Sequence, residues 1–367
     1  MASFTVFMPE TPIEGQGEVN LNLITWSMLQ RIATRLTHRI YEMPVLVLMP
    51  HSRCNCRCVM CDIWKANAEK KEISAEELAR HIATFKKLGV KRVALSGGEA
   101  LMHSNLWKFC ELLNSIGAKI SLLSTGLTIK AHASAIVTHC DDLIVSLDGG
   151  QEIHNRIRNI PNAYEKLSEG VKAVKNTNPS FRVTGRCVLQ KANFKDFFNI
   201  VESAKVLGLD QLSFLAADVS SSAFNRETPW DNQHVSEVAL TTEEVTAFKK
   251  ILKEGFSKFK SYFKSKFIAE SPAKLMGIAS YYEALLGDGE FAPKKCNAPW
   301  VSSVIESDGQ VRPCFFHATY GNIHDEPFEK IVNSSSAISF RKNLSVKSNL
   351  ICQRCVCSLY ISPIQST

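Results

Sequence analysis

The sequence predicts an α/β protein, a partial (β/α)6 barrel followed by a small α+β unit that is rich in cysteine. Three observations lead to this fold class. Apolar segments of strand length alternate with amphipathic segments of helix length from residue 45 to about residue 215, an order typical of a parallel sheet. Six such units fit into only about 170 residues, which favours an incomplete barrel over a closed one. A second group of cysteines begins near residue 290.

Four segments follow from this pattern. Residues 1–44 hold a polar tail and then apolar residues at helical spacing, which predicts a helix that covers one end of the fold. Residues 45–240 form the partial barrel, and the long polar stretch at its end is either a lid or an insertion. Residues 241–289 predict a helical linker, and residues 290–367 form the cysteine-rich unit.

Each barrel unit pairs one predicted strand with the helix that follows it. The strands are expected at 45–49, 92–95, 120–123, 142–147, 182–189 and 211–214. The helices are expected at 74–88, 104–116, 130–138, 163–175 and 194–207, with two more at 241–265 and 272–286. Because crossovers between parallel strands are right-handed, the turns after the strands should gather on one face, where α/β barrels build their active sites.

Length and composition exclude several classes of protein. The 367 residues are 45% hydrophobic and 22% charged, which is ordinary for a globular enzyme and unlike a disordered or fibrous chain. No apolar run reaches the ~18 residues of a membrane-spanning helix, and no secretory leader is recognisable. We therefore expect a cytoplasmic protein whose twelve cysteines stay reduced. Nucleic acid is not an expected partner, since no base-reading motif is present.

The loop after the first predicted strand is the most informative segment. Cys54, Cys58 and Cys61 have the C-x3-C-x2-C spacing, with which one loop can supply three thiolates to a cubic iron–sulfur cluster and leave the fourth iron without a protein ligand. A metal with an open position is typical of catalytic sites. Cys56 lies inside the loop but does not fit this spacing, so we interpret it as a spare thiol.

Three further turns are expected on the same rim as this loop. They are Ser96-Gly97-Gly98-Glu99 after the second strand, Thr125-Gly126 after the third, and Ser146 with Asp148-Gly149-Gly150 after the fourth. With the cysteine loop, the Gly-Gly-Glu turn and the partial barrel in this order, residues 45–215 resemble the radical S-adenosylmethionine (radical SAM) enzymes.

This resemblance implies a [4Fe–4S] cluster on Cys54, Cys58 and Cys61, whose open iron binds the amino and carboxylate groups of S-adenosylmethionine. It implies further that one electron from the cluster cleaves the cofactor, and that the resulting 5′-deoxyadenosyl radical takes a hydrogen atom from a substrate. The electron is expected to come from a donor such as flavodoxin or ferredoxin.

The resemblance also assigns cofactor contacts to residues of these turns, namely Met60, Gly97, Gly98, Glu99, Thr125, Ser146, Asp148 and Arg158. The two glycines would let the backbone approach the cofactor amino group, and Ser146 would contact the ribose. The chain departs from the family at Met60, where an aromatic residue is usual, and at Ala100, where proline is common. Neither departure removes a ligand.

The C-terminal cysteines predict a second metal site. Asp308-Gly309 between two apolar segments is a hairpin signal that would bring Cys296 and Cys314 together. Cys352 and Cys355 form a C-x2-C pair that could complete a four-thiolate site. The spacing alone also permits structural zinc.

Beside the radical SAM loop, residues 290–360 resemble the twitch domain, the short form of the SPASM domain. The resemblance implies a second, auxiliary [4Fe–4S] cluster on Cys296, Cys314, Cys352 and Cys355. Cys357 either replaces Cys355 or has no such role.

A closed auxiliary cluster suits a reaction in which the substrate radical loses an electron after hydrogen abstraction. By family analogy this predicts an oxidoreductase that acts on a sugar-like or cyclitol-like small molecule, with bond formation on a peptide as the alternative. A zinc-stabilised binding protein is the alternative from another class. Asp218 in the polar stretch and Arg186 on the fifth strand are the candidate catalytic residues, and Arg226, Asp231 and His234 are further candidates for substrate contact.

Overall fold

A curved sheet of nine strands organises the protein, of which the computed structural model describes residues 21–363. The strand order is β6-β5-β4-β3-β2-β1-β7-β8-β9. The first six strands are all parallel and confirm the partial barrel: β1 (Val45–Leu48), β2 (Arg92–Leu95), β3 (Lys119–Ser124), β4 (Asp142–Ser146), β5 (Arg182–Leu189) and β6 (Gln211–Ala216).

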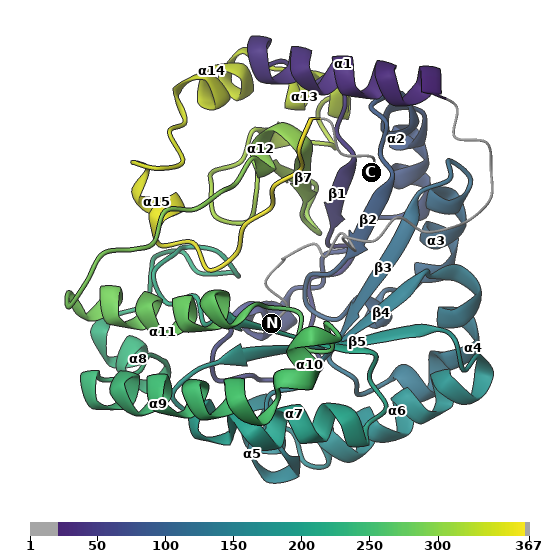
Figure 1. Ribbon diagram of the computed structural model, residues 1–367. Helices are drawn as coiled ribbons and strands as arrows, with labels where there is room; N and C mark the ends of the chain where they lie inside the picture. Colours follow the sequence, from purple (N-terminus) through teal and green to yellow (C-terminus); the bar gives the residue numbers. More distant parts are fainter. Residues whose placement is uncertain (1–20, 364–367) are drawn as a thin grey trace.

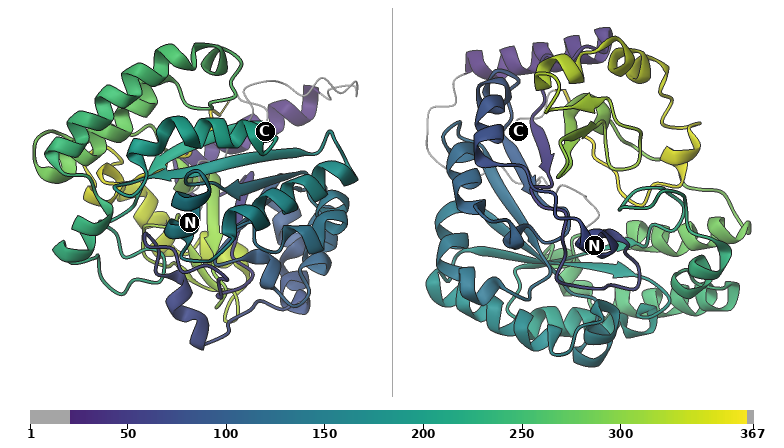
Figure 2. Two further views of the ribbon diagram at one scale, coloured as in Figure 1. Left: turned by 90° about the horizontal axis from the view of Figure 1, so that it is seen from below. Right: turned by 180° about the vertical axis from the view of Figure 1, so that it is seen from behind.

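Helices cover the outer side of this sheet (Figures 1 and 2). The predicted barrel helices are confirmed as α2 (Ala75–Lys87), α3 (Leu106–Asn114), α4 (Ile129–His139), α6 (Ala163–Thr177) and α7 (Phe197–Val206). The first of them shows why they form: Ser74 caps its N-terminus by accepting from the Glu77 N–H, and Leu78 and Phe85 bury the face toward the sheet. Among residues 21–363, no helix is both long enough and apolar enough to cross a bilayer.

Two helices of the barrel region were not predicted from the sequence. These are α5 (Gln151–Arg158), which begins at the end of the fourth turn, and α8 (Asn232–Val238), which lies in the polar stretch. The predicted helices that follow are confirmed as α9 (Thr242–Lys258) with the short α10 (Lys260–Lys264), and as α11 (Pro272–Leu286).

The cysteine-rich unit continues the barrel sheet. Its strand β7 (Ser302–Ile305) pairs in parallel with β1, so that Val45 lies opposite Ser302. The predicted hairpin is confirmed, since β7 pairs antiparallel with β8 (Gln310–Arg312), and β9 (Gly321–Asn322) adds to the edge. Gly309 occupies the turn at a φ of 82°, a conformation that favours glycine. The division of the chain near residues 240 and 290 stays a prediction.

The helix α1 (Leu21–Thr37) lies across one end of the fold, above the C-terminal unit (Figure 1), as the sequence predicted. The segment after α1 is bonded to C-terminal residues. The Asn333 side chain pairs with both backbone groups of Ile40, and Arg341 Nε donates to the His38 carbonyl at 2.6 Å. Four short helices complete the unit: α12 (Ala298–Val301), α13 (Phe328–Val332), α14 (Ser335–Asn343) and α15 (Leu350–Gln353).

Candidate active site

The turns that follow the first four strands line one pocket at the rim of the barrel, as the fold prediction required. We call it the rim pocket. Its walls include Cys54, Cys58, Cys61, Ile63, Ser96, Gly97, Gly98, Thr125, Ser146 and Arg158. Eight of these residues, all except Ile63 and Ser96, are ones that the sequence singled out as cysteine or cofactor positions. Three soft thiolate donors on one wall suit an iron–sulfur cluster.

Hydrogen bonds to its backbone groups hold the cysteine loop in place. Asn67 bonds both backbone groups of Cys54 through its side chain, with each distance 2.9 Å. Two loop N–H groups, those of Arg57 and Val59, donate to carbonyl groups at the end of α5. Cys56 is buried but does not line the rim pocket, as its interpretation as a spare thiol requires.

The turn at Gly97 and Gly98 packs directly against the cysteine loop. Gly97 has a φ of 101°, in the region that favours glycine. A Cβ atom on Gly98 would overlap the backbone carbonyl of Arg53, one residue before the first cysteine of the cluster motif. The absence of side chains here therefore lets the turn and the loop approach each other and leaves bare backbone on the pocket wall.

We expect Gly98→Ala to push the cysteine loop away from the turn and to lower S-adenosylmethionine binding by at least about tenfold, as displaced supports of metal ligands do. Equilibrium binding of the cofactor to the cluster-loaded protein measures this loss. Gly277→Ala is the matched control, because nothing lies within 4 Å of a Cβ atom there and helix α11 tolerates alanine. Equal cofactor affinity in the two variants would contradict the prediction.

Glu99 ties the second turn to the third. Its carboxylate is fully buried and accepts from the Leu101 N–H at 3.2 Å and from the Thr125 N–H at 2.7 Å. The hydroxyl groups of Ser124 and Thr125 also lie within bonding distance. Burial raises the pKa of Glu99, and the hydrogen bonds from Thr125 oppose this rise. These contacts make Glu99 a support of the second and third turns.

Arg158 links the cysteine loop to the fourth turn. Its Nη1 lies 3.5 Å from Cys58 Sγ, and its Nη2 forms an ion pair with the fully buried Asp148. Asp148 also accepts from the Val188 N–H at 3.1 Å. Arg158 thus lines the rim pocket, whereas Asp148 lies behind it. Neither Glu99 nor Asp148 is among the lining residues of the pocket, so any effect they have on a cofactor would pass through their neighbours.

A larger cavity of about 460 Å³ adjoins the rim pocket and shares Ile63, Gly97 and Gly98 with it. Its other walls include residues 222–227 of the polar stretch, residues 306–308 of the hairpin, Phe315, and residues between 49 and 71 on either side of the cysteine motif. Phe224 stacks on Phe315 with ring centroids 5.8 Å apart. The polar stretch therefore covers a cavity, which is the property expected of a lid and not of a mere insertion. We call residues 217–231 the lid.

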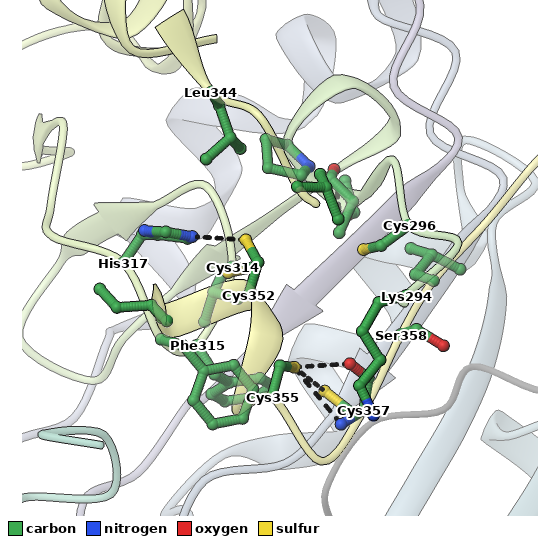
Figure 3. A pocket seen from close by; sticks show the side chains of 18 of the residues that line it. Lys294, Cys296, Cys314, Phe315, His317, Leu344, Cys352, Cys355, Cys357 and Ser358 are labelled. Atoms are coloured by element: carbon green, nitrogen blue, oxygen red, sulfur yellow. Dashed lines mark hydrogen bonds between the residues drawn. The ribbon is translucent and has the colours of Figure 1, made fainter. Parts of the chain in front are cut away.

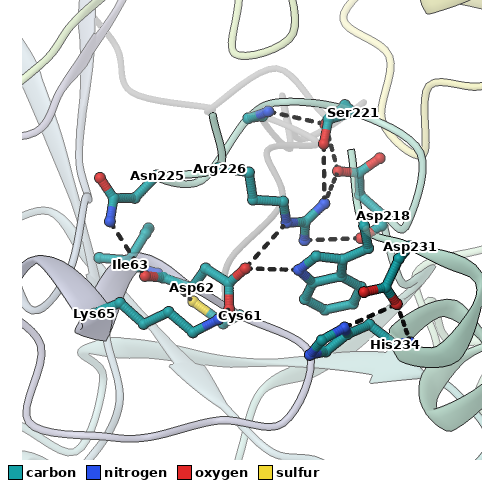
Figure 4. A network of polar contacts seen from close by, with 12 residues as sticks. Cys61, Asp62, Ile63, Lys65, Asp218, Ser221, Asn225, Arg226, Asp231 and His234 are labelled. Carbon is teal, nitrogen blue, oxygen red and sulfur yellow. Dashed lines mark hydrogen bonds and ion pairs between the residues drawn. The ribbon is translucent and has the colours of Figure 1, made fainter. Parts of the chain in front are cut away.

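The lid is bonded to the residue that follows the cysteine motif, Asp62 (Figure 4). Trp230 Nε1 donates to Asp62 Oδ2 at 2.6 Å, and Arg226 Nε lies 3.9 Å from the same oxygen. The Arg226 guanidinium also lies 4.0 Å from the centre of the Trp230 ring and forms a 2.9 Å ion pair with Asp218. Asp62 and Trp230 were not singled out in the sequence, although the place of Asp62 beside Cys61 is a signal that could have found it.

The four polar residues predicted as substrate contacts in the lid region occupy three different places. Asp218 lines a small pocket together with Met60 and Phe224, and Arg226 lines the large cavity. Asp231 and His234 are instead exposed and pair with each other at the start of α8. Met60, which was predicted as a cofactor contact, does not line the rim pocket and shares this small pocket with Asp218.

Arg186 lies deeper in the barrel. It is buried on β5 with its Nε 3.4 Å from Ser213 Oγ, in a small polar pocket that also contains Asp142. Burial lowers the pKa of Arg186 to about 10, partly offset by the carboxylate of Glu270. This pocket is lined by residues of the barrel strands and shares none of them with the large cavity.

The C-terminal cysteines line one further cavity, which we call the auxiliary cavity (Figure 3). Cys296, Cys314, Cys352, Cys355 and Cys357 all reach it, from segments that are far apart in the sequence. The five thiols surround a space instead of converging on a point. Within the described part of the chain, no three His, Cys, Asp or Glu side chains are grouped to hold a single metal ion. Thiols around a largely apolar space suit a multi-iron cluster.

Two features of the auxiliary cavity were not expected from the sequence. Cys355 and Cys357 both line the cavity, and their sulfur atoms lie 3.9 Å apart. His317 also lines it, and its Nε2 lies 3.4 Å from Cys352 Sγ. The spacing Cys314-x2-His317 is the sequence signal that could have drawn attention to this histidine.

Comparison with known proteins identifies the class of protein that this fold and these cysteine sites define. Residues 48–204 match the radical SAM superfamily, and residues 296–356 match the iron–sulfur cluster-binding domain called SPASM. The chain is therefore a radical SAM enzyme with a C-terminal SPASM domain. Its first domain binds a [4Fe–4S] cluster and S-adenosylmethionine, and the second implies auxiliary iron–sulfur binding. The zinc-stabilised binding protein is left without support.

Several individual proteins are similar to this chain. It is 24% identical to the AdoMet-dependent heme synthase of Methanosarcina barkeri over 306 residues. This alignment covers 79% of this chain and 81% of the relative. It is 22% identical to the subtilosin biosynthesis protein AlbA of Bacillus subtilis, over 77% of this chain and 58% of the relative. A GTP 3′,8-cyclase of Staphylococcus epidermidis is 31% identical, but the match spans only 38% of this chain and 44% of the cyclase.

Solved structures show the same fold at low sequence identity. Streptococcus suis SuiB bound to its precursor peptide SuiA superimposes with a TM-score of 0.62 at 12% identity, covering 96% of this chain and 80% of SuiB. The anSMEcpe structure with bound AdoMet has a TM-score of 0.58 at 20% identity, covering 83% of this chain and 84% of that one. These likenesses concern the fold, and the roles of individual side chains in this chain stay predictions.

Proposed function

We propose that the protein is a radical SAM oxidoreductase that removes two electrons from its substrate, the second of them through the auxiliary cluster. The position of the large cavity carries this proposal. Ile63, Gly97 and Gly98 line both this cavity and the rim pocket, and Phe315 lines both this cavity and the auxiliary cavity. A substrate bound in the large cavity would therefore lie next to both cysteine sites.

The cysteines are assigned to the two clusters as follows: Cys54, Cys58 and Cys61 to the first, and Cys296, Cys314, Cys352 and Cys355 to the second. When bound, the first cluster and S-adenosylmethionine supply the group that takes a hydrogen atom from the substrate, with the starting electron delivered by a donor such as flavodoxin or ferredoxin. The lid and the hairpin keep water away from the substrate during this step.

Removal of a hydrogen atom and then of an electron leaves one proton to be lost from the substrate. We assign Asp218 as the group that accepts it, because its side chain lines the pocket beside Met60. Arg226, whose Nη1 lies 2.9 Å from Asp218 Oδ2, positions this carboxylate. Arg186, deeper in the barrel, is the second candidate for contact with the substrate.

A small molecule is the proposed substrate. The volume of about 460 Å³ falls within the roughly 300–1,000 Å³ of small-molecule sites, and the heme synthase relative matches 79% of the chain. Peptide modification is the second candidate, supported by the similarity to the subtilosin biosynthesis protein. Incubation of the enzyme with deuterated candidates of each class tests the choice, because only the true substrate transfers deuterium to 5′-deoxyadenosine. Transfer from a peptide alone would overturn the small-molecule proposal.

The two-cluster proposal predicts uncoupling in Cys314→Ala. The wild type purified without oxygen should hold about eight iron atoms per chain, whereas the variant should hold about four. The variant should still release 5′-deoxyadenosine but form no oxidised product. Cys110→Ala is the control, because Cys110 is buried in the barrel layer and lines neither cysteine site. An unchanged iron content in Cys314→Ala would contradict the proposal.

A further inference from the structure

We propose that His317 is a positioning residue of the auxiliary cluster, which donates a hydrogen bond from Nε2–H to the Cys352 thiolate and thereby raises the reduction potential of that cluster. This inference rests on the proposed function in one respect, namely that the cysteines of the auxiliary cavity bind an iron–sulfur cluster. It concerns a residue outside the cysteine motif.

The imidazole of His317 is aimed at Cys352 and held there. His317 is 5% exposed, and its Nε2 lies 3.4 Å from Cys352 Sγ (Figure 3), within hydrogen-bond range for sulfur. On its other side the ring packs edge-on against Phe340, with centroids 4.9 Å apart and an angle of 67° between the planes. Phe340 in turn contacts Tyr320 at 5.7 Å. The ring is therefore fixed from both sides.

The backbone of His317 is fixed as well. Its carbonyl oxygen accepts from Arg312 Nη1 at 3.2 Å, and Arg312 Nε forms a 2.8 Å ion pair with Glu306. Arg312 lies on β8, which belongs to the main sheet. The histidine is thus anchored to the main sheet, whereas Cys352 lies on the short helix α15.

The direction of the hydrogen bond follows from the ligand chemistry. A cysteine bound to iron is a thiolate and has no proton, so its sulfur can only accept. The imidazole must then be the donor, through Nε2–H. Because His317 is almost completely buried, a water molecule has little access to replace this donor. Lys294 and Ser358 line the same cavity, but the charge of Lys294 acts on Cys355 and Cys357, whereas His317 is in contact with Cys352.

A donor at a ligand sulfur changes the redox equilibrium of the cluster. Reduction adds a negative charge that spreads onto the sulfur atoms, so a hydrogen bond to sulfur stabilises the reduced form more than the oxidised form and raises the potential. In the proposed reaction, a cluster held by these cysteines would accept an electron from the substrate radical. A raised potential favours this transfer, and it keeps the electron from returning.

Two variants separate the hydrogen bond from the packing of the ring. His317→Phe keeps an aromatic ring for contact with Phe340 but removes the donor, whereas His317→Gln keeps an N–H group. The measurement is a redox titration of the intact, two-cluster enzyme, followed by electron paramagnetic resonance. We expect His317→Phe to shift the reduction equilibrium of the auxiliary cluster about tenfold toward the oxidised form, which is ~59 mV for one electron. His317→Gln should stay close to the wild type.

The radical SAM cluster in the same samples is the internal control, and its potential should not change. An equal potential in wild type and His317→Phe, with both clusters present, would overturn the role of His317. A strong nitrogen hyperfine coupling in the wild type would overturn it too, since it would make His317 an iron ligand. Absence of a second cluster in the wild type would instead refute the two-cluster function, and the inference with it.

Discussion

Cys58→Ala abolishes the cleavage of S-adenosylmethionine, with 5′-deoxyadenosine release lowered by more than about a hundredfold, because loss of a metal ligand exceeds the ~10- to 100-fold cost of losing an outer partner. Cys58 lines the rim pocket together with Cys54 and Cys61. With two thiolates left on the loop, the cluster should not assemble, and about four iron atoms per chain should be lost. Iron analysis and chromatography of 5′-deoxyadenosine check both effects.

Cys56→Ala is the matched control for this prediction. Cys56 lies in the same loop and is equally inaccessible to solvent, but it is not part of the pocket wall. This variant should keep its iron and release 5′-deoxyadenosine at a rate comparable to the wild type. If Cys56→Ala loses the cluster while Cys58→Ala keeps it, the assignment of the three thiolates is wrong.

Arg158→Met destabilises the folded protein by about 3–5 kcal/mol, the usual cost of removing one partner of a buried ion pair. Both members of the pair with Asp148 are almost completely buried. The substitution leaves the Asp148 carboxylate without its counter-charge in a site that water does not reach. Urea unfolding followed by circular dichroism measures the change in the free energy of unfolding.

Arg156→Met controls for the substitution itself, since Arg156 lies on the same helix α5 but is exposed. Its effect should stay within about 0.5 kcal/mol. The double variant Asp148→Asn/Arg158→Met should recover part of the lost stability, because it removes the unpaired charge and keeps an acceptor for the Val188 N–H. Equal stability of Arg156→Met and Arg158→Met would refute the proposed importance of the pair.

Much of the fold was predictable because strands and helices follow from the local pattern of apolar and polar residues. All six barrel strands were expected, and β2 and β5 have the predicted bounds. Helix α5 was missed because it has only eight residues and begins directly after the Gly149-Gly150 turn. Ile153 and Ile157 in the next eight residues are four apart, the spacing of an amphipathic helix. The pairing of β7 with β1 was not predictable, since more than 250 residues separate the two strands.

The candidate site was predictable to a different degree for each kind of residue. The motif cysteines and the Gly97-Gly98 turn were found because ligand spacing and glycine are local signals, and they do share one pocket. Glu99 and Asp148 were found by the same signals, but their side chains are buried in support of the turns and do not line that pocket. Which side of a turn a carboxylate faces depends on its neighbours in space.

The sequence by itself determined the class of this protein, through the spacing of Cys54, Cys58 and Cys61 and the order of strands and helices behind them. Only the tertiary structure decided that the lid bonds Asp62, that one cavity adjoins both cysteine sites, and that His317 faces Cys352. The physical reason is the range of the interactions. Ligand spacing and hydrophobic periodicity act within a few residues, whereas these contacts join segments that only the folded sheet brings together.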